Sequence, residues 1–247
     1  MERGSSINEA LVAFTADAPA DPYAAVLMNY YYNTIDNAWV LTVGVAYGKP
    51  DPNPPIFQNL TRPPYVASSF AISSLTTVTA NFATSNPSGF RQTSWTLTIH
   101  NDASLISKIV EIFKEEADPI KFLSLPGLLL QPITLNMISH FSGNGGNALG
   151  ITDEDGPLIL ISVSIRWNST HDDEQIMKAA RNIINRSNNT ACSLGLGHRF
   201  IYQNYAAAEQ DVFQSYGQEN HERLRAVSAK YDPENIFGKL QPGYFKL

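Results

Sequence analysis

The residues best suited to chemistry stand near the end of the chain, in the tetrapeptide Tyr202-Gln203-Asn204-Tyr205. Alternation from Phe200 onward predicts a strand that places Tyr202 and Asn204 on one face and Tyr205 on the other. The Asn204 amide offers two donors and an acceptor, which suits the flat polar edge of a planar ring system. The Tyr205 phenol is a candidate general acid or base, although a pKa of about 10 means that its surroundings must help. The simpler alternative is an ordinary edge strand without a chemical role.

Other groupings of polar residues lead to more modest predictions. The glycine-rich stretch 143–147 lacks the Lys-Ser/Thr pair and the G-x-G-x-x-G spacing of phosphate-binding loops, so it predicts a turn or a loop over a substrate pocket. The acids Asp172, Asp173 and Glu174 fit the first turn of a helix, where the helix dipole favours negative charge. The histidines show no metal-ligand spacing, and the single Cys192 excludes an internal disulfide. No metal site is predicted.

Composition limits the classes of function. The 247 residues include 43% hydrophobic and 16% charged residues, an ordinary globular balance. A net charge of -6 without a basic patch argues against a nucleic-acid partner. No apolar run approaches the ~20 residues that a membrane span requires. The first residues do not read as a secretory signal, because Glu9 interrupts any apolar core.

Glycosylation sequons give the one indication of cellular location. Four N-x-S/T sequons occur, at Asn59, Asn168, Asn185 and Asn188. They favour a secretory route, provided that a longer product supplies the signal.

The elements that must position these residues are read from hydrophobic periodicity. Helices are expected at 4–17, with Ser5 or Ser6 as the N-cap, at 102–116 beginning at Asp102, and at 172–186. Strands are expected at 26–32, 39–47, 92–100 and 158–167, and a proline-rich surface loop at 49–55. This order predicts an α+β fold, with an antiparallel or mixed sheet covered by helices on one face.

The strand 158–167 has two contrasting faces. One face carries Ile159, Ile161, Val163, Ile165 and Trp167. The other begins with Leu158 and Leu160 and continues with Ser162, Ser164 and Arg166, which suggests a substrate that is at least partly polar. The stretch 187–192 reads as a polar break, and a domain boundary is expected near 190–198.

The tail continues with a further helix and a short apolar end. Ser215 to Gln218 has the form of a capping box, and Pro233 ends the helix that follows. The residues expected on one face of this helix are Asn220, Leu224, Val227 and Tyr231. The final apolar stretch is Gln241-Pro242-Gly243-Tyr244-Phe245.

This order resembles the C-terminal signature of the berberine-bridge-enzyme-like FAD-linked oxidases, whose flavin domain is of the PCMH type. Three upstream stretches, 84–95, 128–134 and 144–150, are similar to fungal members of that family. The resemblance implies the C-terminal portion of an FAD-dependent oxidoreductase that oxidises an organic small molecule by hydride transfer to flavin, with O2 as acceptor. It implies that Tyr202 and Asn204 contact the cofactor and that Tyr205 is the catalytic base.

The resemblance also implies a division of the chain. Residues 1–18 are expected to be a linker helix from a missing N-terminal flavin domain, 19–195 a substrate-binding domain, and 196–247 the return segment of the FAD-binding domain. The residues for covalent FAD attachment are not in this chain, so the chain alone is expected to bind FAD weakly or not at all.

Two positions depart from the family pattern. Many relatives carry an acid soon after the Tyr-x-Asn-Tyr, whereas here three alanines, 206–208, precede Glu209. Plant members often carry Gln or Glu where this chain has Ser162, which is a poor base.

A flavin-free module that binds a small molecule or a partner is the alternative reading. The tail would then expose an apolar surface that favours self-association. The residues expected on it are Phe213, Phe237, Tyr244 and Phe245.

Overall fold

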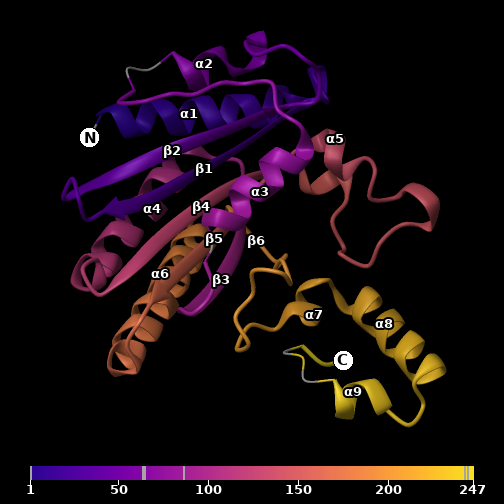
Figure 1. Ribbon diagram of the computed structural model, residues 1–247. Coiled ribbons are helices and arrows are strands. Elements are labelled where there is room, and N and C mark those ends of the chain that lie inside the picture. The colour runs from indigo at the N-terminus through magenta and orange to yellow at the C-terminus, as the bar shows by residue number, and fades with distance from the viewer. Residues whose placement is uncertain (1, 63–64, 86, 242, 244) are drawn as a thin grey trace.

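The computed structural model describes residues 2–62, 65–85, 87–241, 243 and 245–247. Within them lies a sheet of strand order β2-β1-β4-β5-β3-β6, in which every pairing is antiparallel. The strands are β1 (Ala24–Asn33), β2 (Ala38–Tyr47), β3 (Arg91–His100), β4 (Ser124–Ile133), β5 (Leu158–Trp167) and β6 (Gly197–His198). The predicted α+β fold is confirmed (Figure 1).

Helices pack on one face of this sheet and a separate group follows at the C-terminal end (Figure 1). Their bounds are α1 (Glu2–Asp17), α2 (Gln58–Thr61), α3 (Leu75–Ser85), α4 (Ala103–Ala117), α5 (Leu135–Ile138), α6 (Asp173–Ser193), α7 (Val212–Ser215), α8 (Gln218–Tyr231) and α9 (Ile236–Leu240). Helices α1, α4 and α6 share one hydrophobic core with the sheet. None of the helices in the described ranges combines the length and apolar character that a membrane span requires.

Strand β5 is the centre of this core. Its odd-numbered residues, predicted to share a face, are all buried. The neighbouring strand β4 was missed in the sequence, although Leu128 and Leu130 are fully buried. Pro126 and Pro132 explain the omission, because proline inside a run normally argues against a central strand.

Two helices begin where local chemistry predicts and one does not. The Asp102 carboxylate accepts a hydrogen bond from the Leu105 amide at 2.7 Å and caps α4, as expected. Asp173 and Glu174 occupy the first turn of α6. Helix α1 begins at Glu2, so the prediction that Ser5 or Ser6 is its N-cap is wrong.

Helix α6 also continues to Ser193, through the stretch 187–192 where a polar break was predicted. That prediction is wrong because Ser187 and Ala191 are fully buried, so packing outweighs the weak helix propensity of the surrounding polar residues.

The C-terminal segment forms a second hydrophobic cluster with the other face of β5. Leu158 and Leu160 lie there against Phe200, Val212 and Tyr216. This cluster is built from residues that alternate with those of the main core, so the first half of β5 is buried on both faces.

The predicted capping box at Ser215 is wrong. Ser215 is the last residue of α7, is buried, and donates to the Val212 carbonyl at 2.6 Å. Gly217, with φ +89°, separates α7 from α8, and a glycine tolerates this left-handed conformation best. Helix α8 ends before Pro233, as predicted, and has no buried residue. Pro242 and Tyr244 lie outside the described residues.

Candidate functional site

The tetrapeptide 202–205 forms a turn, so the predicted strand is wrong. The Tyr205 amide donates to the Tyr202 carbonyl at 3.0 Å. The turn brings the two phenol rings together, with centroids 5.0 Å apart and planes at 87°. Tyr202 and Tyr205 therefore share one side instead of lying on opposite faces. The alternating pattern failed because both rings pack into the second cluster.

Asn204 stands at the exposed tip of this turn. Its Nδ2 donates to the Tyr202 hydroxyl at 2.8 Å. One amide donor that could serve a planar ligand is thus used to orient the neighbouring phenol. The three predicted site residues, Tyr202, Asn204 and Tyr205, are brought into one small group.

The polarity of β5 changes along its second face. Leu158 and Leu160 are covered by the C-terminal segment, whereas Ser164 is exposed and Arg166 is half-buried. Ser162 lies between them, is 3% exposed, and has its hydroxyl 3.4 Å from that of Ser94. The face thus becomes open and polar immediately beside the segment that carries the turn.

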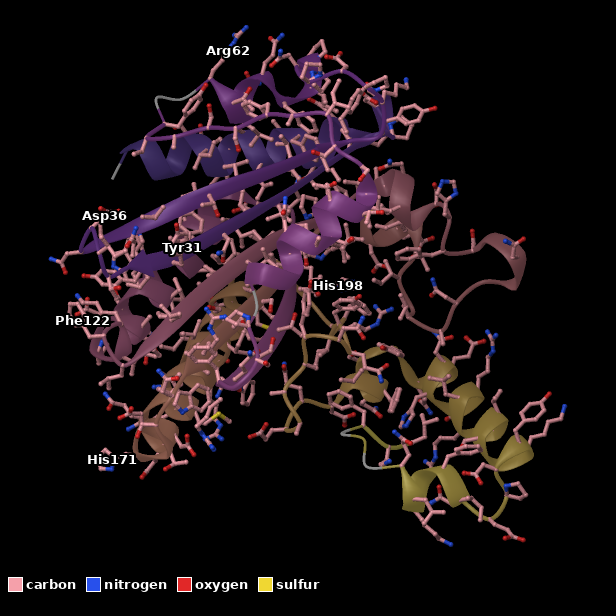
Figure 2. All side chains as sticks on the ribbon, viewed as in Figure 1. Tyr31, Asp36, Arg62, Phe122, His171 and His198 are labelled. Atoms are coloured by element: carbon pink, nitrogen blue, oxygen red, sulfur yellow. The ribbon has the colours of Figure 1, made fainter. Side chains whose placement is uncertain are left out.

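Strands β1 and β4 extend this open face. The register aligns Tyr31, Gly127 and Ser164 in one row across three strands (Figure 2 labels Tyr31). A Cβ at Gly127 would lie 3.4 Å from the Asn29 Oδ1, so the glycine keeps the middle of this surface low. The floor of this face is of mixed polarity, because Leu125 and Leu129 of β4 lie on it as well.

Burial controls the ionisation of the Tyr205 phenol. Burial raises its pKa, the neighbouring Tyr202 raises it further, and the Gln131 side chain of β4 acts in the opposite direction. The phenol is therefore protonated at neutral pH and can donate a hydrogen bond or a proton. A role as base requires a bound ligand or a further charge to lower this pKa.

An acid-histidine pair fixes the start of the C-terminal segment. His198 Nδ1 accepts from the Phe200 amide at 3.2 Å, which leaves the proton on Nε2, 3.1 Å from the Asp155 Oδ1. Burial lowers the pKa of His198 and outweighs the opposing effect of Asp155. Both ring nitrogens are engaged, so this pair is structural. Figure 2 shows His198 between the sheet and the C-terminal helices.

Two other groups of residues singled out in the sequence lie at the surface. The stretch 143–147 is exposed and turns through Asn144, Gly145 and Gly146, all with positive φ, which confirms the predicted turn. Glu209, the first acid after the tetrapeptide, is half-exposed and lies 3.6 Å from Arg181 on α6. Among the described residues, no group of three or more His, Cys, Asp or Glu side chains is arranged to hold a metal ion.

Comparison with known sequences gives relatives over almost the whole chain. Residues 201–242 match the family model described as "Berberine and berberine like". The chain is 33% identical to the FAD-dependent monooxygenase tpcD of Cochliobolus heterostrophus, over 98% of this chain and 49% of that protein. It is 30% identical to an FAD-dependent monooxygenase of Fusarium proliferatum, with the same two coverages of 98% and 49%. The chain spans about half the length of the curated relatives it matches.

Solved structures share the fold. The 6-hydroxy-D-nicotine oxidase of Arthrobacter nicotinovorans superposes with a TM-score of 0.62 at 16% identity, over 94% of this chain and 48% of that one. A carbohydrate oxidase of Microdochium nivale, in complex with a substrate analogue, gives 0.56 at 18% identity, over 94% and 50%. At these identities the likeness shows the fold alone.

The raised pKa of Tyr205 can be measured in the chain itself. We expect 3-fluorotyrosine placed at position 205 to titrate at a higher pH in the folded chain than in the urea-unfolded chain, because burial disfavours the phenolate. Fluorine NMR over a pH series gives both midpoints. Equal midpoints, or a lower one in the folded chain, would contradict the described environment.

Proposed function

We propose that this chain, a berberine-bridge-enzyme-like polypeptide, forms the substrate side of an FAD-dependent oxidoreductase. The resemblance seen in the tail is confirmed, since the family match falls on that segment. The observation that carries the proposal is the placement of Tyr202, Asn204 and Tyr205 beside the open polar face of the sheet. The proposed reaction is oxidation of an organic small molecule, with O2 as the final electron acceptor.

The residues of this surface fit one side of a flat cofactor or substrate. Gly127 leaves space that a side chain would occupy next to Asn29, and Ser164 presents a hydroxyl in the same row. The exposed Asn204 amide and the Tyr205 phenol stand at its border. A flavin, when bound, supplies the hydride acceptor. This chain would supply the floor and the orientation, and Tyr205 would accept the proton that the substrate loses with its hydride, once a bound ligand or a further charge has lowered the pKa of the phenol.

A polar substrate is favoured by the same surface. Ser164 and Arg166 face the open side of β5, and the Arg166 guanidinium lies 4.9 Å from the Phe90 ring centroid. These groups suit a substrate with both oxygen functions and an aromatic or apolar portion.

Exposed apolar side chains indicate where a flavin-binding portion would dock. On α8 and α9, Tyr231, Phe237 and Leu240 are between 72% and 76% exposed. Phe213 and Phe245, also expected on such a surface, are half-buried and line a cavity of about 420 Å³. On α3, Leu75 and Phe82 are 78% and 62% exposed. Apolar surface of this kind is unusual on a monomer and favours a partner.

This docking has a direct test. We expect the chain alone to self-associate, and a variant with Phe237→Ser and Leu240→Ser to shift towards monomer, because the mutations remove apolar contact area. Light scattering over a concentration series measures both. The control, Ile35→Ser, changes a still more exposed apolar residue at the β1–β2 turn and should leave the association state unchanged. A monodisperse monomer of the unaltered chain would contradict the docking proposal.

The role of Tyr205 is tested in the FAD-loaded full-length protein. Tyr205→Phe is expected to slow flavin reduction by substrate about 10²-fold or more, the usual loss when a proton-transferring group is removed. Flavin content should be unchanged, and Tyr65→Phe, at a 56% exposed position, should have no effect. Stopped-flow absorbance measures the rate, and an unaltered rate would remove Tyr205 from the mechanism.

A further inference from the structure

The edge of the sheet beside the site is completed by a side chain. Strand β6 pairs only with Thr98 and Ile99 of β3. Two residues earlier, the Thr96 amide donates to Gln210 Oε1 at 3.0 Å, and the Gln210 Nε2 donates to the Thr96 carbonyl at 2.7 Å. The amide of Gln210 thus makes both hydrogen bonds that a residue of a neighbouring antiparallel strand would make.

The same side chain also holds its own loop. Gln210 Oε1 accepts a second hydrogen bond, from the Ala207 backbone amide at 3.0 Å, and the backbone amide of Gln210 donates to the Ala207 carbonyl at 3.0 Å. Ala207 is buried and belongs to the main hydrophobic core. The chain is therefore tied to β3 two residues after Tyr205.

Few other polar contacts hold this part of the segment. Tyr205 pairs within its own turn, through Tyr202, and no backbone hydrogen bond is described between residues 201–206 and the sheet. The ring of Tyr205 packs in the second cluster, and its phenol hydrogen-bonds with the Gln131 side chain of β4. The link from Gln210 to Thr96 joins the residues just after the turn to the edge of β3.

The chemistry of glutamine is required for this arrangement. The three bonds use one donor and an acceptor that serves two amides, which a carboxylate or an apolar side chain of similar length cannot reproduce in full. Glu209 does not compete with Gln210 for the Thr96 amide, because its carboxylate lies near Arg181 at the surface.

We propose that Gln210 is a positioning residue, whose side chain takes the place of a missing strand on β3 and thereby sets where Tyr205 stands relative to the open face. The inference rests on the proposed function, since positioning matters only if Tyr205 takes part in the reaction. The hydrogen bonds between Gln210 and Thr96 exist whatever the function of Tyr205.

A cavity adjoins Gln210, so we expect the chain to remain folded when this residue is changed. It has a volume of about 520 Å³ and is lined by Trp95, His198 and Gln210, among others. Water can enter it and satisfy the Thr96 backbone groups when the side chain is removed. We therefore expect variants to loosen the 202–210 segment locally.

The first measurement uses hydrogen exchange of the chain alone, in the unaltered form and in Gln210→Leu and Gln210→Glu. Leu should speed exchange of the Thr96 and Ala207 amides by at least about tenfold, because both lose their acceptor. Glu keeps the acceptor and should retain most of that protection. Gln203→Leu, which alters an exposed glutamine of the same turn, should change neither amide. Unchanged exchange at Thr96 in Gln210→Leu would overturn the proposal.

The second measurement uses flavin reduction in the FAD-loaded full-length protein. Gln210→Leu should lower the maximal rate at least about tenfold with unchanged flavin content, and Gln210→Glu should recover part of it. If exchange changes but the rate does not, Gln210 pairs the edge without positioning Tyr205, and the proposal fails. If Tyr205→Phe also leaves the rate unchanged, the proposed function fails as well, so the two failures are distinguishable.

Discussion

The packing of the C-terminal segment against Leu158 and Leu160 is the contact on which the rest of the site depends. These residues lie on the face of β5 opposite the main core, so the first half of the strand belongs to two hydrophobic clusters at once. Burial of large aliphatic side chains contributes roughly 1.5–3 kcal/mol each, which makes this junction a strong constraint on where the segment can lie. Because the burial stops at Ser162, the remaining half of the face stays open and polar beside Tyr205.

Polar links supplement this apolar contact at each end of the segment. At its start, His198 meets Asp155 from the loop before β5. Burial raises the pKa of Asp155, but hydrogen bonds from Thr152 and His198 and the charges of His198 and Arg199 outweigh it and lower the pKa overall. The carboxylate therefore contributes stability above its unfolded pKa, and this contribution is lost as the pH falls through the folded value. At the other end, Gln210 satisfies the edge of β3.

The sequence predicted the elements whose signals are local. Strand β5 and helix α4 combine clear periodicity with few breaking residues, and Asp102 supplies a helix start. Strand β4 escaped prediction because it contains Pro126 and Pro132, and only its place between β1 and β5 makes it a strand. The predicted break at 187–192 failed for a related reason, since burial decides the end of α6.

The local structure of the candidate site residues was not predicted from the sequence. The resemblance identified Tyr202, Asn204 and Tyr205, whereas the strand predicted for them is a turn that reverses the relation of the two phenols. The contacts that fix the turn join residues far apart in sequence, such as Gln210 and Thr96, separated by 114 positions. No local pattern marks such a pair. Similarly, Gln131 on β4 affects Tyr205 only through the folded sheet.

We propose that this chain provides the substrate side of a flavoprotein and that a further portion is required to hold FAD. The most direct measurement is the flavin absorbance of the purified chain after incubation with FAD and removal of unbound cofactor, compared with the full-length protein. We expect little or no retained flavin for the chain alone and about one FAD per molecule for the full-length protein. Stoichiometric flavin on the chain alone would contradict it.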